Sequence, residues 1–284
     1  MLVTGKTSVY GIIGDPVEHS LSPVIQNSAF EKLGMDCVYV PFRVATSALG
    51  VAVRGLRSQG VIGFNVTVPH KTEIIKYLDK LDLIAKNVGA INTVKIAQNK
   101  LVGYNTDTTG VVEALKTNGI LPGNSTFTIL GAGGAAKAIA YALIESTPRL
   151  TVLNRTFEKA RGLKRNLMRR SGKEIKIDSL TKRNLERELL KTDVLINATS
   201  IGMKGNLGKI PIEGTLPQDL IVFDIVYDRC DTELVRQAKR SGCRTIRGTE
   251  MLLYQAAAAF ELWTGVKAPV DTMRDSLVSF GFSR

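Results

Sequence analysis

The glycine-rich segment Gly131-x-Gly133-x-x-Ala136 has the residue types and spacing of a phosphate-binding turn. It follows the apolar run 126–130 directly, and a helical pattern over 134–145 comes after it. The first glycine allows a tight turn, the second lets a pyrophosphate approach the backbone, and the small third residue lets helix and strand pack closely. The free N–H groups at the start of the helix favour anions. The segment therefore predicts dinucleotide binding.

A second segment predicts which dinucleotide binds. Enzymes that use NAD usually place an acidic residue about 20 residues after the turn, on the adenosine ribose. This chain has Asn154-Arg155-Thr156 at the end of the next predicted strand, and nine basic residues fall between positions 155 and 176. An arginine pairs with a 2′-phosphate, which an acid would repel. We therefore expect NADP, with Arg155 as a phosphate ligand.

Polar side chains also stand at predicted strand ends in the first third of the chain. They belong to the segments 65–71, 92–93 and 104–107, and the carboxyl ends of parallel strands face the ligand crevice. Asp107 could equally serve only as a helix N-cap. Ser20 and Ser22 put two hydroxyls at a predicted helix start, where an anion is favoured, and capping by Ser22 explains only one of them.

Apolar periodicity and turn residues predict the elements that position these groups. The segment 118–126 reads as a linker, and after it strands and helices alternate strictly, as in a doubly wound parallel sheet. We predict two α/β lobes, the second of the Rossmann type, with the C-terminal helices returning to the first lobe. The expected strands are 9–13, 37–44, 61–68, a hairpin of 90–96 with 101–104, and 126–130, 150–153, 194–198, 221–224 and 244–246. The expected helices are 23–33, 48–58, 108–116, 134–145, 156–170, 249–263 and 270–280.

Composition limits the classes of protein that need to be considered. The 284 residues are 44% hydrophobic and 23% charged, with no apolar run of membrane-spanning length and no signal-peptide pattern at the start. Three cysteines and two histidines make a disulfide framework or a zinc site unexpected, so we expect a cytoplasmic protein without a metal. The net charge of +12 could indicate nucleic-acid binding, but no aromatic residues interleave with the basic run. We expect neither nucleic acid nor a membrane as partner.

Nine segments together resemble shikimate dehydrogenases, in the expected order along nearly the whole chain. They are SLSP (20–23), NVTVPHK (65–71), GAINTV (89–94), GYNTD (103–107), GAGGAA (131–136), NRT (154–156), NATSIGM (197–203), DIVY (224–227) and GTEML with Gln255. The resemblance implies reversible NADPH-dependent reduction of 3-dehydroshikimate to shikimate, in aromatic amino-acid biosynthesis. It also implies a substrate-binding and catalytic domain of residues 1–107, completed by 249–284, and an NADP-binding domain of 108–248.

The resemblance also assigns roles to residues. Lys71 and Asp107 would form the catalytic pair and contact the substrate. The other substrate ligands would be Ser20, Ser22 and Tyr227 for the carboxylate and Asn65, Thr67, Asn92 and Gln255 for the ring hydroxyls. The cofactor ligands would be Gly131, Ala132, Gly133, Gly134, Ala135, Asn154, Arg155, Thr156, Lys159 and Thr199, with Ile225, Gly248 and Met251 at the nicotinamide. One departure is Arg229, which stands where a proline often follows the DIVY segment.

Two alternative functions remain compatible with the sequence. A quinate/shikimate dehydrogenase of broader substrate range would share these motifs. A noncatalytic NADP-sensing protein would keep the glycine turn but need not keep Lys71, Asp107 and Gln255 together. A homodimer is also compatible with the sequence, which does not fix the oligomeric state.

Overall fold

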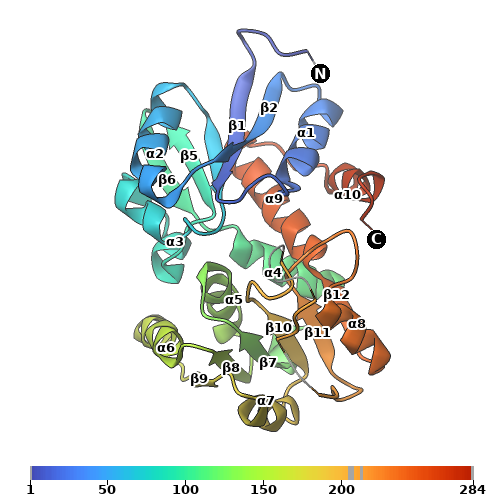
Figure 1. Ribbon diagram of the computed structural model, residues 1–284. Helices are drawn as coiled ribbons and strands as arrows, with labels where there is room; N and C mark the ends of the chain where they lie inside the picture. The colour runs from blue at the N-terminus through green and yellow to red at the C-terminus, as the bar shows by residue number, and fades with distance from the viewer. Residues whose placement is uncertain (1, 204–207, 212–213, 283–284) are drawn as a thin grey trace. The chain divides into compact units, whose positions relative to one another are not determined.

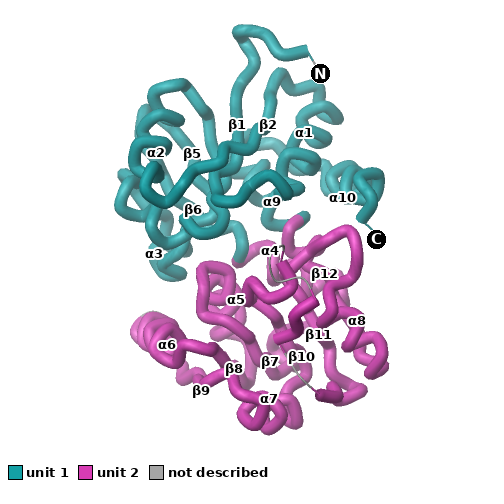
Figure 2. The backbone as a smooth tube through the Cα atoms, viewed as in Figure 1, with its two compact units in different colours: residues 1–107, 253–284 teal, residues 108–252 magenta. Residues whose placement is uncertain are grey.

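The chain folds into two compact units, which Figure 2 colours separately. In this computed structural model, residues 2–203, 208–211 and 214–282 are described. One unit consists of residues 1–107 and 253–284, and the other of residues 108–252. Both contain a sheet and flanking helices, so the predicted α/β class is confirmed (Figure 1). Within the described ranges no helix is long and apolar enough to cross a membrane.

The first unit is built on a mixed sheet with the strand order β2-β1-β3-β5-β6-β4. β1 pairs in parallel with β2 and β3, whereas β5 runs antiparallel to β3 and β6. The β5–β6 hairpin was predicted, and its turn places Gln98 and Asn99 at positive φ, as a tight turn requires. The strands are β1 (Ser8–Gly14), β2 (Cys37–Arg43), β3 (Gly63–Val66), β4 (Lys80–Leu81), β5 (Thr93–Ala97) and β6 (Lys100–Tyr104).

Helices from both ends of the chain complete this unit. Gln26 donates a hydrogen bond to the carbonyl of Ala256, and the Trp263 indole donates to the carbonyl of Val94, at 2.9 and 3.0 Å. The rings of Tyr10 and Trp263 stack at a centroid distance of 5.3 Å. These contacts fix helix α9, which contains Ala256 and Trp263, onto β1, β5 and α1. The helices are α1 (Ser22–Lys32), α2 (Leu49–Ser58), α3 (Leu83–Val88), α9 (Gly248–Thr264, of which residues from 253 lie in this unit) and α10 (Val270–Ser279).

The second unit contains a parallel sheet with the order β12-β11-β10-β7-β8-β9. Renumbered from β7, this is the order 3-2-1-4-5-6 of a Rossmann sheet, so the predicted doubly wound fold is confirmed. The strand order reverses between β7 and β10, and dinucleotides bind at such a switch point. The strands are β7 (Thr126–Leu130), β8 (Arg149–Asn154), β9 (Lys176–Ser179), β10 (Val194–Asn197), β11 (Ile221–Asp224) and β12 (Arg244–Arg247).

The helices of this unit connect successive strands. The sequence did not predict β9, α7 or α8. β9 is short and polar, and α7 and α8 are helices of only eight residues with many charged side chains. The helices are α4 (Asp107–Thr117), α5 (Gly134–Ile144), α6 (Phe157–Ser171), α7 (Lys182–Leu189) and α8 (Glu233–Arg240).

A buried carboxylate ties α7 to the edge of this sheet. Glu188 is 1% exposed and forms ion pairs with Arg149 on β8, Lys176 on β9 and Arg187. Burial alone would raise the pKa of Glu188, but the hydrogen bond and charge of Lys176 and the charge of Arg149 outweigh it and lower that pKa. The charged carboxylate therefore stabilises this corner of the fold.

We predict that Glu188→Gln lowers the free energy of unfolding by about 1.5–3 kcal/mol, since it removes the anion between Lys176 and Arg149 and turns an amide N–H toward one of these donors. Glu186→Gln, an exposed change of the same kind on the same helix, should shift stability by less than about 0.5 kcal/mol. Urea unfolding of both variants measures the difference. Equal effects would show that the buried ion pairs contribute nothing specific.

Candidate active site

A lysine–carboxylate pair lies at the centre of the first unit's polar cluster. Lys71 Nζ donates to Asp107 Oδ2 at 2.6 Å, and the two side chains are 17% and 6% exposed. Lys71 follows the turn after β3, and its carbonyl accepts a hydrogen bond from Ile91 N–H at 2.7 Å, which fixes the backbone. Asp107 begins α4, directly after the segment that follows β6. A cation held this way, with part of its surface open, can donate a proton to a bound ligand.

Asn92 connects this pair to α9. Its Nδ2 group lies 2.9 Å from Asp107 Oδ1 and 3.2 Å from Gln255 Oε1, and its Oδ1 accepts from Thr106 N–H at 2.7 Å. The Thr93 hydroxyl also donates to Asn92 Oδ1. The Asp107 carboxylate thus accepts from Lys71 and Asn92, and no described backbone N–H donates to it. The alternative reading of Asp107 as merely an N-cap is therefore wrong.

Asn65 extends the cluster toward β2. Its Nδ2 group donates to the carbonyl of Asn92 and to Thr93 Oγ1, both at 3.0 Å, and its Oδ1 accepts from the Tyr39 hydroxyl at 2.7 Å. Both amide hydrogens are therefore used within the protein. Only the second lone pair of Oδ1 is left for a ligand, so Asn65 could act toward a hydroxyl only as an acceptor.

The two serines lie at the start of α1. The prediction that Ser22 caps this helix is wrong: Leu21 holds the N-cap position and makes no side-chain cap, and Ser22 is the first helical residue. Ser20 Oγ accepts a hydrogen bond from Ser22 N–H at 3.3 Å. No described residue accepts a hydrogen bond from either hydroxyl, so both can donate to an anionic ligand.

The other predicted substrate residues are less tightly connected. Thr67 is half-buried just after β3, and its methyl group would lie 2.4 Å from a Cβ on Gly14, so only glycine fits there. Tyr227 is half-buried and belongs to the second unit. The structure thus joins Lys71, Asn65, Asn92, Asp107 and Gln255 in one hydrogen-bonded cluster. Thr93 and Thr106, from the polar segments that the sequence singled out, also belong to it, as does Tyr39. Sequence reasoning missed Tyr39, because only the fold brings it to Asn65.

The glycine-rich turn in the second unit has the predicted geometry. Gly131 adopts φ +111°, and a Cβ there would lie 2.8 Å from the carbonyl oxygen of Ala198. Gly133 is the N-cap of α5 and faces open space, whereas Ala136 is fully buried against the sheet. Gly131 is thus required by the fold. Gly133 leaves room in front of the first N–H groups of α5, a cradle that fits a pyrophosphate.

The segment after β8 presents unpaired positive charge. Asn154 Nδ2 donates to the carbonyl of Thr156 at 2.8 Å, which orders the turn before α6. Arg155 and Lys159 are exposed, and no described residue forms an ion pair with either. In contrast, Arg161 is paired with Glu158, and Lys164 with Glu174. Arg155 and Lys159, directly after β8 and in the first turn of α6, are therefore cations available to a 2′-phosphate, and the basic run as a whole contributes less charge than its count suggests.

The other predicted cofactor ligand, Thr199, and the three predicted nicotinamide residues lie at the carboxyl edge of the same sheet. Thr199 follows β10, Ile225 follows β11, and Gly248 follows β12. A Cβ on Gly248 would lie 2.3 Å from the carbonyl oxygen of Ile225, so this close packing requires glycine. Met251 is buried one turn further along α9. These residues therefore follow strands on the β10–β12 side of the switch point, whereas Arg155 follows β8 on the other side.

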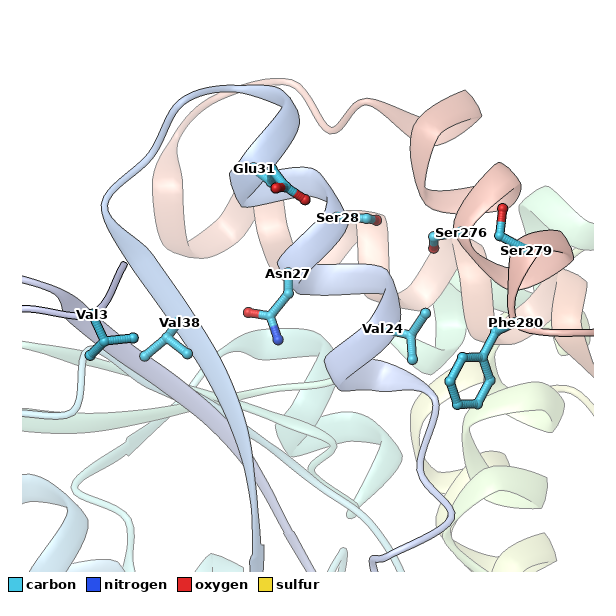
Figure 3. A pocket seen from close by; sticks show the side chains of 9 residues that line it. All are labelled: Val3, Val24, Asn27, Ser28, Glu31, Val38, Ser276, Ser279 and Phe280. Carbon is cyan, nitrogen blue, oxygen red and sulfur yellow. The ribbon is translucent and has the colours of Figure 1, made fainter. Parts of the chain in front are cut away.

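A groove in the first unit is lined by other residues, and no metal site accompanies it in the described ranges. An open groove of about 690 Å³ in the first unit contains none of the predicted site residues (Figure 3). No described group of three or more His, Cys, Asp and Glu side chains could hold a metal ion. The groove is lined by Val3, Val24, Asn27, Ser28, Glu31, Val38, Ser276, Ser279 and Phe280.

A Rossmann sheet with a glycine-rich turn, together with a buried lysine–aspartate pair, defines the class of NAD(P)-dependent oxidoreductases. Comparison with known proteins narrows this class. Family models match three segments: the shikimate dehydrogenase substrate binding domain at 12–94, shikimate / quinate 5-dehydrogenase at 116–229, and the shikimate 5'-dehydrogenase C-terminal domain at 248–278. The chain belongs to the shikimate dehydrogenase family, as its motifs predicted.

Individual relatives match over nearly the full length. The shikimate dehydrogenase (NADP(+)) of Methanocaldococcus jannaschii is 40% identical, over 98% of both chains. The crystal structure of a shikimate dehydrogenase in complex with NADP+ matches with a TM-score of 0.91 and 38% identity, over 99% of this chain and 98% of that one. The crystal structure of a shikimate 5-dehydrogenase from Listeria monocytogenes, in complex with shikimate and NAD, matches with a TM-score of 0.87 and 37% identity, over 97% of this chain and 98% of that one.

The two glycines of the turn should respond differently to alanine. Gly131→Ala should lower the free energy of unfolding by about 2–4 kcal/mol, because alanine would be strained at positive φ and its Cβ would clash with the Ala198 carbonyl oxygen. Gly133→Ala should cost less than about 1 kcal/mol, yet it should weaken NADP binding at least tenfold by filling the cradle. Thermal unfolding and NADP titration measure the two effects. Unchanged NADP affinity in Gly133→Ala would exclude this turn as the pyrophosphate site.

Proposed function

We propose that this protein catalyses the reversible NADPH-dependent reduction of 3-dehydroshikimate to shikimate, in the pathway to chorismate and the aromatic amino acids. The observation that carries the proposal is the Lys71–Asp107 pair held by Asn92, in a chain of the shikimate dehydrogenase family. The first unit would bind the substrate and supply the catalytic pair, and the second unit would bind NADP.

The proton chemistry follows from the charges of the pair. Reduction of a ketone places negative charge on its oxygen, which then needs a proton and a nearby cation. The Lys71 ammonium supplies both, and in the oxidation direction the neutral amine accepts the hydroxyl proton. Asp107 lies 2.6 Å from Lys71 Nζ and is itself held by Asn92, so it orients the lysine and can accept a hydrogen bond from the same hydroxyl.

The glycine-rich turn and the unpaired cations after β8 fit the phosphates of NADP. When bound, NADPH supplies the hydride that reduces the carbonyl carbon. The first turn of α5 and the space at Gly133 would receive the pyrophosphate, with the backbone of residues 131–135 around it. Asn154, Arg155, Thr156 and Lys159 would hold the 2′-phosphate. Ile225, Gly248 and Met251 would line the nicotinamide, and Thr199 would also contact the cofactor.

The substrate would be held by complementary groups. The hydroxyls of Ser20 and Ser22 would donate to a carboxylate, which Tyr227 would also contact. Asn65, Thr67, Asn92 and Gln255 would bind the ring hydroxyls together with Lys71 and Asp107. Because Asn65 and Asn92 are fixed by protein hydrogen bonds, they would discriminate the positions of the hydroxyls rather than adapt to them.

We also propose a cytoplasmic enzyme without nucleic-acid partners. The three cysteines are free, which suits a reducing compartment. A homodimer is the assembly that we would test first, by sedimentation equilibrium. The function itself is tested by NADP reduction with shikimate and then with quinate. Turnover of shikimate alone supports the proposal, equal turnover of both supports the broader quinate/shikimate activity, and turnover of neither overturns it.

Lys71→Ala should lower turnover by roughly 10²–10⁴-fold, the usual contribution of a general acid–base group, with a smaller loss of substrate affinity. Lys80→Ala, which removes an exposed lysine of the same unit, should keep wild-type turnover. Steady-state assays in the oxidation direction measure both. Near-normal turnover of a folded Lys71→Ala variant would contradict the assignment.

The double variant Ser20→Ala/Ser22→Ala should weaken shikimate binding while leaving NADP binding unchanged, since the serines and the glycine turn belong to different units. The loss should be at least about tenfold, because two hydrogen bonds to a charged group are removed. Separate titrations with each ligand measure it. If both ligands bind more weakly to the same extent, the serines maintain the fold instead.

Arg155→Ala should weaken NADP binding by about 10- to 150-fold, the equivalent of one hydrogen bond between charged groups, and should leave NAD binding almost unchanged. Arg165→Ala, an exposed arginine further along α6, is the matched control and should have little effect. Added salt should weaken NADP binding more than NAD binding in the wild type. Unaltered discrimination in Arg155→Ala would remove the physical basis for the NADP assignment.

A further inference from the structure

Two polar side chains end neighbouring central strands of the second unit, and the proposed mechanism uses neither. Asn197 is the last residue of β10 and Asp224 the last residue of β11. They lie opposite each other in the parallel register, and both are fully buried, at 0% exposure. Buried polar groups of this kind are costly unless they are hydrogen-bonded, so their partners indicate what they do.

Asp224 accepts hydrogen bonds on both carboxylate oxygens. Oδ1 accepts from Asn197 Nδ2 at 2.9 Å and from Val226 N–H at 3.1 Å. Oδ2 accepts from the Thr232 hydroxyl at 2.5 Å, and Thr232 Oγ1 in turn caps α8 by accepting from Val235 N–H at 3.2 Å. The carboxylate therefore joins β10, the segment after β11 and the start of α8.

Asn197 extends this hydrogen-bond network into the loop after β10. Its Oδ1 accepts from Thr199 N–H at 3.1 Å and from the Thr199 hydroxyl at 2.7 Å. The Thr199 hydroxyl oxygen then accepts from Ile201 N–H at 3.1 Å. Because Asn197 Nδ2 donates to Asp224, the amide is oriented so that its oxygen faces Thr199. Asp224 thus sets the conformation of residues 199–201 through Asn197.

The backbone around these residues is closely packed. A Cβ on Gly248 would lie within 3 Å of the carbonyl oxygens of both Ile225 and Asp224, and a Cβ on Gly131 would meet the carbonyl of Ala198. The loops after β10 and β11, the start of α9 and the glycine turn therefore contact one another at this edge. A shift in one of these loops displaces its neighbours.

Keeping the Asp224 carboxylate charged costs free energy, because the group is fully buried. Burial raises the pKa of Asp224 to about 6, against the opposing hydrogen bonds from Thr232, Val226 N–H and Asn197, which are all neutral. An asparagine would be less costly to bury. It could not, however, accept on both terminal atoms: with its amide nitrogen toward Thr232 Oγ1, the Thr232 hydroxyl hydrogen would lose its acceptor. Acceptance at both positions is what the aspartate contributes.

The place of this network along the edge indicates what it positions. The Arg155 segment lies after β8 and the pyrophosphate cradle after β7, so a dinucleotide held by both would extend across the switch point toward β10 and β11. We propose that Asp224 is a positioning residue for the nicotinamide half of the cofactor, acting through Asn197 and Thr232 on the loops after β10 and β11. This inference rests on the proposed function, since it presumes that a dinucleotide binds.

The test compares two probes of the cofactor site. 2′,5′-ADP contains only the adenine half, whereas NADP also carries the nicotinamide. Asp224→Asn should bind 2′,5′-ADP within about twofold of the wild type, bind NADP about tenfold or more weakly, and lower kcat by roughly ten- to a hundredfold. Asp224→Ala should show larger losses of both NADP affinity and kcat. Asp219→Asn, an exposed aspartate beyond the other end of β11, should match the wild type.

A second pair of variants keeps the proposal testable if the Asp224 variants do not fold. Thr232→Ser retains both hydrogen bonds and should match the wild type, whereas Thr232→Val should show the selective loss of NADP affinity. Equal weakening of 2′,5′-ADP and NADP, or unchanged NADP binding and kcat in Asp224→Asn and Thr232→Val, would overturn the proposal. Failure of the wild type to oxidise shikimate would instead contradict the proposed function, because the binding comparison does not depend on turnover.

Discussion

The ion pair between Lys71 and Asp107 is the interaction on which the rest of the site depends. Removing two charges from water costs several kcal/mol for each ion, and their attraction offsets this only where further hydrogen bonds complete the geometry. Here Asn92 supplies the second hydrogen bond to Asp107, and Thr106 and Gln255 fix Asn92. The mixed sheet, the start of α4 and the middle of α9 are therefore constrained by one pair of charges.

The two units differ in how their polar groups are used. In the first unit the amide N–H groups of Asn65 and Asn92 are satisfied by the protein, which makes a rigid surface for a small polyhydroxy acid. In the second unit Arg155 and Lys159 have no ion-pair partner in the described chain, and Gly133 faces open space. These groups are suited to phosphates, whose charge is the dominant feature to be recognised. The carboxylate of Asp224, in contrast, is satisfied internally and acts on the loops around it.

Much of the fold could be predicted because local sequence and tertiary structure agree there. The β7–α5 turn combines an apolar strand, the glycine spacing and a helical pattern, so motif and fold predicted the same geometry. The mixed order of the first sheet depends on long-range pairing between β3 and β5, which no local pattern encodes. Ser22 looked like an N-cap because it precedes proline, but the chain begins the helix at Ser22 and leaves its hydroxyl free.

The site was predictable as a set of residue types, but not as a network. Only the fold shows that Asp107 accepts from Lys71 rather than capping α4, and that Tyr39 and Thr106 complete the cluster. Asn197 and Asp224 could have been noticed as polar residues ending apolar strands. Their hydrogen bonds to each other depend on the parallel register of β10 and β11, which becomes visible only once the sheet is formed.

The central claim is that Lys71 transfers the proton at the reacting oxygen, and chemical rescue tests it most directly. Primary amines of different pKa would be added to Lys71→Ala, and shikimate oxidation would be followed at constant pH. If Lys71 is the acid–base group, small amines should restore part of the turnover, and the rescue rate should rise with the pKa of the free amine along a Brønsted line. If no amine restores activity, or if rescue is independent of amine pKa, then Lys71 acts only as a fixed charge and the account of the mechanism is wrong.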